Sequence, residues 1–288
     1  MKIGFIGVGV MGKSMVYNLV KHGFEVEVYA RNINKIKDVL DSGIPSRESI
    51  AELVKHNDVI ITIVGYPSDV EEVYFAQNNI YDNVKSGQIV IDMTTSSPTL
   101  AKRIYETFKT KGVSSLDSPV TGGDIGAKNG TLTIFVGGEK DAYEKCLPLF
   151  EAMGTCINYV GVAGNGQHAK LANQIAIAGA ISAMAETITY AQKNNLDVEP
   201  LINAWSSGSA GSWQMKNMAP RILNGDRKPG FFIKHFIKDM KLAKEEALNK
   251  GVSLEMLNTV LDMFSKLAEK EGYEDLGTQA ILDYYKED

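Results

Sequence analysis

The sequence predicts an α/β domain with a mostly parallel sheet, followed by a long helix and an all-helical C-terminal domain. Three observations lead to this prediction. Strand-like and helix-like patterns alternate through the first half of the 288 residues, a glycine-rich turn follows the first strand, and strand signals nearly vanish after Gly166. We therefore assign residues 1–163 to the first domain and 164–288 to the second.

The first predicted strand, Lys2–Ile6, leads through a glycine-rich turn into a predicted helix, Lys13–His22. Gly7, Gly9 and Gly12 spell G-x-G-x-x-G. In that pattern the first glycine makes a tight turn, the second lets a pyrophosphate approach, and the third allows close helix–strand packing. An accidental glycine pattern is the alternative. The residues expected to hold a dinucleotide here are Gly7, Val8, Gly9, Val10, Met11 and Gly12.

A secretory signal peptide is another interpretation of this segment, because Lys2 precedes an apolar run. A signal peptide needs an unbroken apolar region and a small-residue cleavage site. Four polar residues interrupt the run: Lys13, Asn18, Lys21 and His22. We therefore expect the segment to be part of the folded domain.

Further strand patterns end at Ala30 (EVEVYA), Val64 (DVIITIV) and Met93 (QIVIDM), and β-branched residues continue the sheet to about Gly138. Amphipathic stretches separate these strands, which favours helices on both faces of a parallel sheet.

The next segment, Leu171–Gln192, has Glu186 as its only charged residue and is long enough to span a membrane. Asn173, Gln174 and Glu186 would be costly in lipid, so we expect a long helix buried on most sides. The rest of the chain reads as helical.

Composition excludes several kinds of partner. A formal net charge of −5 gives no general attraction to nucleic acid or anionic membranes. Cys146 and Cys156 show no metal-ligand spacing with the four histidines. We expect no bound metal, reduced cysteines in the core, and a cytoplasmic protein.

The end of the second strand bears on the choice of cofactor. An NAD site usually carries an acidic residue here, but this chain has Ala30, Arg31 and Asn32. The guanidinium of Arg31 suits a 2′-phosphate, which predicts NADP, with NAD as the other cofactor. A solvated surface arginine is the alternative.

Two other strand ends are polar and glycine-rich: DMTTSSP (Asp92–Pro98) and DSPVTGGDIGAKNG (Asp117–Gly130). In the second, Thr121, Gly122 and Gly123 can present backbone N–H groups and a hydroxyl to a substrate carboxylate. An ordinary glycine-rich loop is the alternative.

A third polar stretch, GNGQHAKLANQ, places Lys170 at the start of the long helix with Asn173 and Gln174 on nearly the same face. A lysine near a buried surface loses hydration, so it can exchange protons near neutral pH. A lysine extending to solvent is the alternative. We interpret His168 as an ordinary polar residue.

These motifs, together with GFIGVGVMG and FIKDMKLA, resemble the β-hydroxyacid dehydrogenase family in order and spacing over essentially the whole chain. That family includes 3-hydroxyisobutyrate dehydrogenase and the tartronate semialdehyde, glyoxylate and succinic semialdehyde reductases. The resemblance implies a nicotinamide-binding Rossmann domain, an interdomain helix, a helical domain, and a homodimer or homotetramer.

The resemblance also implies roles for individual residues. By position, Lys170 matches the catalytic lysine, and Thr121 stands where the family usually has serine, so its extra methyl could narrow the pocket. The implied substrate-binding residues are Thr121, Gly122, Gly123, Asn173, Gln174 and Phe231. The implied cofactor-binding residues beyond the glycine turn are Arg31, Asn32, Val64, Thr95, Lys238 and Asp239.

The sequence thus predicts an oxidoreductase that moves a hydride between NADP(H) and a small β-hydroxyacid, with Lys170 as general acid and base. A non-catalytic dinucleotide-binding redox sensor and an imine reductase are the alternatives. Imine reductases often carry an acid or tyrosine where this chain has Lys170. The related 6-phosphogluconate dehydrogenases are much longer chains.

Overall fold

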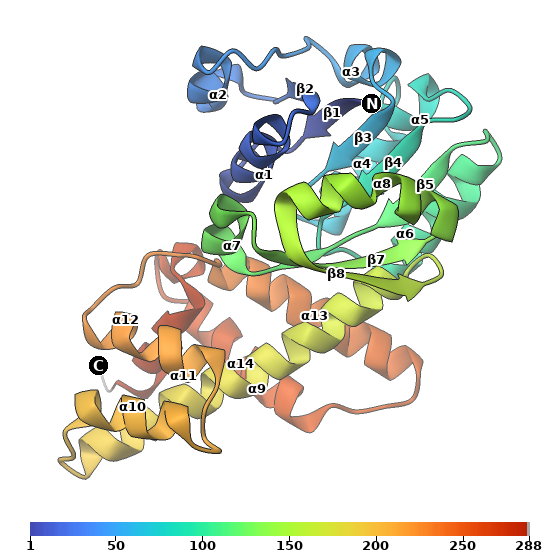
Figure 1. Ribbon diagram of the computed structural model, residues 1–288. Helices are drawn as coiled ribbons and strands as arrows, with labels where there is room; N and C mark the ends of the chain where they lie inside the picture. Colours follow the sequence, from blue (N-terminus) through green and yellow to red (C-terminus); the bar gives the residue numbers. More distant parts are fainter. Residues whose placement is uncertain (287–288) are drawn as a thin grey trace. The chain divides into compact units, whose positions relative to one another are not determined.

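The computed structural model describes residues 1–286 and divides the chain into two compact units, Met1–Lys170 and Leu171–Asp288. The first unit contains one mixed sheet (Figure 1), with strand order β2-β1-β3-β4-β5-β7-β6 and β8 paired with β7. Its strands are β1 (Lys2–Ile6), β2 (Glu25–Tyr29), β3 (Val59–Thr62), β4 (Ile89–Asp92), β5 (Ser114–Asp117), β6 (Val120–Thr121), β7 (Leu132–Gly138) and β8 (Gly154–Gly161).

The predicted parallel sheet is confirmed for β1 to β5, which pair in parallel. β3 and β4 are buried along their whole length, which explains their unbroken runs of β-branched residues. β7 runs antiparallel to β5 and β6 and parallel to β8. The strands β6 and β8 are not predicted from the sequence, because β6 has two residues and all but one residue of β8 are exposed or partly exposed, so neither has a clear apolar pattern.

Helices cover both faces of this sheet, as predicted. Side chains of α1 and α8 pack on one face, and those of α3, α4, α5 and α6 pack on the other. The helices are α1 (Val10–Lys21), α2 (Lys37–Asp41), α3 (Ile50–His56), α4 (Pro67–Phe75), α5 (Ile80–Asn83), α6 (Pro98–Lys109), α7 (Gly123–Asn129) and α8 (Lys140–Met153). A short 3₁₀ helix, Ile33–Ile36, precedes α2.

The chain passes from the first unit to the second within α9 (Asn165–Lys193). The predicted domain boundary lies just before this helix. The second unit is helical, as predicted, with α10 (Val198–Ser207), α11 (Trp213–Asn217), α12 (Ala219–Leu223), α13 (Ile233–Asn249) and α14 (Glu255–Ala268), followed by 3₁₀ segments at Tyr273–Asp275 and Thr278–Tyr285. One apolar core joins these helices around Phe236 and Phe264. The two rings pack edge to face, with their centroids 5.1 Å apart.

One expectation about burial was wrong, that for Cys156, and the expectation for α9 holds except along one stripe. Most of α9 is buried or partly buried, but Ala172, Ala176, Ala183 and Tyr190 form an exposed stripe along one side of it. By length and composition alone α9 could cross a membrane, as the core helix of a soluble protein also can. Cys146 is buried, whereas Cys156 is exposed because it lies on the edge strand β8.

Candidate active site

The three glycines after β1 differ in what surrounds them. Gly7 has a φ of +99°, and a Cβ there would lie 2.0 Å from the carbonyl oxygen of Ile63. A Cβ on Gly12 would lie 2.0 Å from the carbonyl oxygen of Gly7, whereas one on Gly9 would meet nothing within 4 Å. The turn therefore needs Gly7, the packing of α1 needs Gly12, and Gly9 faces open space of the kind a pyrophosphate requires.

Arg31 follows β2 and is largely exposed, with 73% of its side chain accessible. Its guanidinium nitrogens lie 3.9 Å from Asp69 Oδ1 and 3.9 Å from Glu72 Oε2, both on α4. At this exposure and distance the pairs hold the arginine only weakly. Asn32 uses its side-chain oxygen to accept a hydrogen bond from the Asn34 amide, 3.1 Å away, at the start of the 3₁₀ helix.

Hydrogen bonds connect the loops that follow β3 and β4. The Val64 amide donates to Thr94 Oγ1 at 2.9 Å, and the Thr94 amide donates to Asp92 Oδ1 at 3.1 Å. Thr62 Oγ1 donates to the same Asp92 oxygen at 3.0 Å. Asp92 and Thr94 are buried, and Thr95, the predicted cofactor contact, is partly exposed beside them. The position of Thr95 is therefore set by a buried polar cluster.

The start of α9 is fixed by Asp117, the last residue of β5. Its carboxylate accepts hydrogen bonds from the backbone amides of Gly164 and Gln167, each 2.8 Å long. Burial raises the pKa of the Asp117 carboxyl to about 6, the two amide donors oppose that rise, and the nearby Asp92 adds to it. Because this cap comes before the apolar run, α9 begins at Asn165 and Lys170 lies in its second turn rather than at its first residue.

Gln167 is fully buried and connects α9 to the loop after β4. Its Oε1 accepts from the Ser96 amide at 2.8 Å, and its Nε2 donates to the Thr94 carbonyl at 2.7 Å. Lys170 follows three residues later on the same helix and is 5% exposed. Two turns of α9 thus carry the anchoring side chain and the predicted catalytic side chain.

The predicted carboxylate loop lies between β6 and α7. Gly122 and Gly123 have backbone φ angles of +129° and +64°, which residues other than glycine rarely adopt. Gly122 is exposed, and Thr121 and Gly123 are partly exposed. The loop can therefore offer backbone groups to a small anion without displacing packed side chains.

In the second unit the predicted site residues Gln174 and Asp239 are joined. Gln174 Nε2 on α9 donates to Asp239 Oδ2 on α13 at 2.6 Å, and Gln174 Oε1 accepts from Asn173 Nδ2 at 2.9 Å. Lys238 Nζ lies 3.1 Å from Asp239 Oδ1. Gln174 is 1% exposed, and both ends of its amide are hydrogen-bonded to other residues of the protein. The partly exposed Asn173 is therefore the better candidate to contact substrate. Phe231 is partly buried, with its ring 5.8 Å from that of Phe236.

The first unit thus places the predicted cofactor and carboxylate-binding segments at the carboxyl ends of its strands. These segments are Gly7–Gly12 after β1, Arg31 after β2, Val64 after β3, Thr95 after β4 and Thr121–Gly123 at β6. Sheets of this kind bind ligands at that edge. Four further residues of this region, Asp92, Thr94, Asp117 and Gln167, are not predicted as site residues from the sequence, although each lies within one of the polar motifs. A polar residue at the end of a buried strand was the available signal for Asp92 and Asp117.

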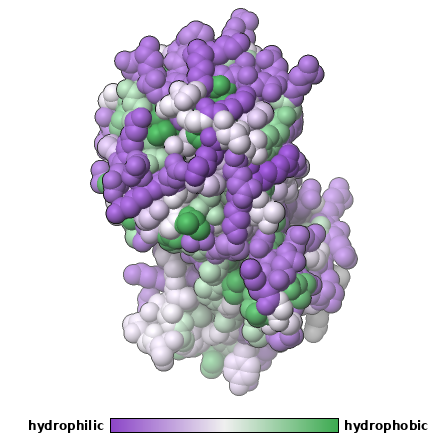
Figure 2. Space-filling view, turned by 90° about the vertical axis from the view of Figure 1, so that its right-hand side faces the viewer, coloured by the Kyte–Doolittle hydropathy of each residue, from purple (hydrophilic) through white to green (hydrophobic). Residues whose placement is uncertain are grey.

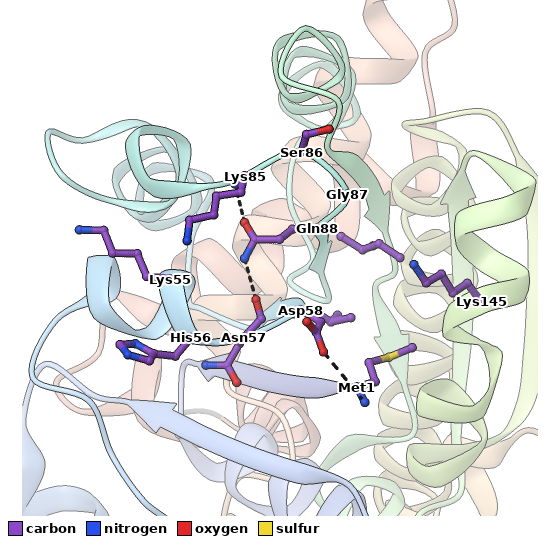
Figure 3. Close-up of a pocket in the computed structure, with 12 residues that line it drawn as sticks. Met1, Lys55, His56, Asn57, Asp58, Lys85, Ser86, Gly87, Gln88 and Lys145 are labelled. Carbon is purple, nitrogen blue, oxygen red and sulfur yellow. Dashed lines mark hydrogen bonds and ion pairs between the residues drawn. The ribbon is translucent and has the colours of Figure 1, made fainter.

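A cavity of about 520 Å³ lies elsewhere in the first unit (Figure 3). Lys55, Lys85 and Lys145 line it, together with Asp58 and Gln88. Its residues precede β3 and β4, so it opens at the amino ends of the strands, opposite the glycine turn. We therefore do not place the dinucleotide in this cavity.

Comparison with known proteins gives a consistent result. Residues 2–161 match the family described as the NAD binding domain of 6-phosphogluconate dehydrogenase, and residues 164–285 match that described as NAD-binding of NADP-dependent 3-hydroxyisobutyrate dehydrogenase. The uncharacterized oxidoreductase YkwC of Bacillus subtilis is 52% identical over 97% of this chain and 96% of its own length. The 2-hydroxy-3-oxopropionate reductase of Escherichia coli is 35% identical over 94% and 93%, respectively.

Among solved structures, the fold is similar to that of Mycobacterium tuberculosis 3-hydroxyisobutyrate dehydrogenase with L-serine. The TM-score is 0.90 at 28% sequence identity, and the match covers 99% of both chains. Both family matches describe binding of a nicotinamide dinucleotide, in agreement with the glycine turn.

Proposed function

The chain belongs to the β-hydroxyacid dehydrogenase family, and from this membership we propose that it interconverts a small β-hydroxyacid and its semialdehyde, using NADP(H) and Lys170 as general acid and base. That it is a nicotinamide-dependent oxidoreductase acting on CH–OH groups follows from the family. The observation that carries the finer proposal is the anchoring of Lys170 on a helix fixed to the loop after β4.

Lys170 moves a proton at the reacting oxygen in this proposal. In oxidation its neutral amine takes the proton of the substrate hydroxyl, and in reduction its ammonium returns a proton to the carbonyl oxygen. The bound nicotinamide accepts or supplies the hydride. Lys170 is 5% exposed, so its amine is shielded from bulk water and can exchange its proton with a bound substrate.

Replacing Lys170 by alanine tests this role. We expect kcat to fall by about 10²-fold or more, with the Kd for NADPH nearly unchanged, because the amine acts on the reacting oxygen rather than on the dinucleotide. The measurements are steady-state kinetics and cofactor titration by fluorescence. A kcat within a few-fold of wild type would contradict the proton-transfer role.

The preference for NADP(H) rests on Arg31. An exposed guanidinium after β2 can pair with a 2′-phosphate through two hydrogen bonds, and no acidic side chain stands beside it in the chain to bind a ribose hydroxyl. Titrating both cofactors decides the preference, and Arg31→Asp should invert or flatten it. Tighter binding of NAD(H) by the wild type would contradict the assignment.

The substrate proposal rests on the loop of Thr121, Gly122 and Gly123, which suits one carboxylate. The names of two relatives include 2-hydroxy-3-oxopropionate and L-serine, both three-carbon acids with an oxygen on the third carbon. We infer three- or four-carbon substrates of this kind: 3-hydroxyisobutyrate, tartronate semialdehyde, glyoxylate or succinic semialdehyde.

A panel of acids and their uncharged analogues tests the carboxylate loop. Each aldehyde acid and β-hydroxyacid is assayed beside the matching neutral aldehyde or alcohol, with both cofactors. We expect kcat/KM to favour the acids. Equal turnover of the neutral analogues would refute the role of the loop while leaving the dehydrogenase activity intact.

We also propose that the protein forms a homodimer or homotetramer, and we place it in the cytoplasm. Figure 2 shows apolar residues among the polar ones on one face of the molecule. In the second unit Met256 is 67% exposed, and Tyr190 in the exposed stripe of α9 is 71% exposed, so both can contact a second copy of the chain. Light scattering during size-exclusion chromatography measures the mass; a monomer of 31.5 kDa would contradict this proposal.

A further inference from the structure

A continuous set of hydrogen bonds connects three segments of the first unit that are far apart in sequence. Asp117 at the end of β5 binds the start of α9 through the amide of Gly164, the residue before the helix, and that of Gln167 in its first turn. The Gln167 side chain then binds the backbone of the loop after β4 at Thr94 and Ser96. The position of α9 is therefore linked to that loop by fully buried polar contacts.

Packing at the same junction leaves no room for adjustment. A Cβ on Gly166 would lie 2.2 Å from the Asp117 carbonyl oxygen and 2.7 Å from that of Phe135. A Cβ on Gly137 of β7 would lie 2.7 Å from Asp117 Oδ1. The first turn of α9 thus lies directly on the ends of β5 and β7, where a side chain would push it away.

We propose that Asp117 and Gln167 are positioning residues for Lys170, holding its helix in register with the loop that carries Thr95. This inference rests on the proposed role of Lys170 as the proton-transfer group. Neither Asp117 nor Gln167 touches substrate in this proposal. They act by fixing the backbone from which the Lys170 amine reaches the reacting oxygen.

The physical reason lies in the length of the lysine side chain. Lys170 has four rotatable side-chain bonds, so the amine can reach one point in space reliably only if its backbone is held. A displacement of about 1 Å at the reacting atoms can cost about 10²-fold in rate. Gln167 stands three residues before Lys170, so loss of its two bonds would loosen the same face of the helix.

A double-mutant cycle tests the proposal, using Gln167→Met alone and combined with Lys170→Ala. Methionine keeps the length of glutamine but removes both hydrogen bonds. In the otherwise wild-type enzyme we expect kcat to fall about 10- to 100-fold, with little change in the Kd for NADPH. In the Lys170→Ala background Gln167→Met should cause no further loss, because a residue that acts only through Lys170 has nothing left to position.

The matched control is Gln192→Met, since Gln192 is an exposed glutamine near the end of the same helix. It should leave kcat unchanged. Asp117→Asn provides a second variant: one of its amide atoms would be a donor facing a backbone N–H, so it should lower kcat in the wild-type background and not in the Lys170→Ala background. Retained NADPH binding shows that each variant is folded.

The outcomes separate this proposal from the proposed function. Equal losses from Gln167→Met in both backgrounds, or no loss in either, would overturn the positioning role. If Lys170→Ala itself keeps wild-type kcat, the proposed function fails instead, and any loss in the Gln167→Met enzyme would then have to act through another group.

Discussion

Two buried carboxylates in different units interact with α9, and they differ in the groups that bind them. Asp117 in the first unit is 5% exposed and accepts hydrogen bonds from two backbone amides. Asp239 in the second unit is 1% exposed and has the Gln174 amide and the Lys238 ammonium. One carboxylate is held by the backbone and the other by side chains of the helical core.

The difference has consequences for how each region responds to change. Burial raises the pKa of the Asp117 carboxyl to about 6, and its neighbour on β4, the carboxylate of Asp92, contributes to this rise. Asp117 therefore makes the first unit sensitive to pH. Asp239 instead makes the second unit sensitive to loss of a charged partner, because its removal takes a carboxylate 3.1 Å away from the largely buried Lys238 ammonium.

Of the variants that test this difference, Asp239→Ala should have the largest effect on the free energy of unfolding. Breaking a buried ion pair on one side typically costs 3–5 kcal/mol in the free energy of unfolding, in this case about that amount, because the side chain of Lys238 is only 11% exposed. Urea denaturation measures it. The control is Asp262→Ala, which breaks an exposed pair with Lys266 and should cost no more than about 1 kcal/mol. Equal losses of stability in the two variants would show that the pair of Asp239 and Lys238 is no more important than an exposed one.

The second prediction concerns pH and Asp117. Its pKa is raised from 3.8 to about 6 on folding, so its contribution to stability is greatest below pH 4 and is lost as pH rises through 6. Two pKa units correspond to about 3 kcal/mol. The difference in unfolding free energy between wild type and Asp117→Asn should therefore fall by about that amount from pH 4 to pH 7. A difference that is constant with pH would show that Asp117 is not perturbed.

A third variant, Gln174→Met, sharpens the comparison within α9. It removes one donor from Asp239 and the acceptor for Asn173, which should cost about 1–3 kcal/mol of stability. Thermal and urea unfolding measure the loss. Gln192→Met on the exposed surface of the same helix should change stability by less than about 0.5 kcal/mol. If the two glutamines behave alike, the bond to Asp239 contributes nothing.

The smallest expected effect on stability is at Arg31, because this side chain is exposed whereas Asp117 and Asp239 are buried. Glu72→Gln removes a negative charge 3.9 Å from the guanidinium, so we expect NADP⁺ to bind up to about fivefold more tightly, with stability changed by less than about 0.5 kcal/mol. Glu71→Gln is the matched control, because Glu71 lies beside Glu72 on α4 but pairs with Arg103 instead of Arg31. Tighter NADP⁺ binding in the control variant, or weaker binding after Glu72→Gln, would argue against a 2′-phosphate at Arg31.

The sequence predicted most of the fold because its signals are local. The apolar runs of β1 to β4, the glycines of the first turn and the helical periodicity of the second unit each depend on neighbouring residues. The exposed stripe of α9 could not be predicted in this way. Its alanine-rich composition is compatible with either burial or exposure, and only packing leaves the stripe through Ala176 and Tyr190 uncovered.

The same distinction between local signals and long-range contacts applies to the candidate site. The sequence by itself determined which residues are candidates, because Gly7, Arg31, Thr121 and Lys170 belong to motifs whose chemistry can be read from residue type and spacing. The tertiary structure alone decided that Asp117 and Gln167 hold the start of α9, and that Gln174 is bonded to Asp239, 65 residues away in sequence. Such contacts join segments that are distant along the chain, so their geometry, and the dielectric environment that shifts the pKa of Asp117, exist only once those segments have packed together.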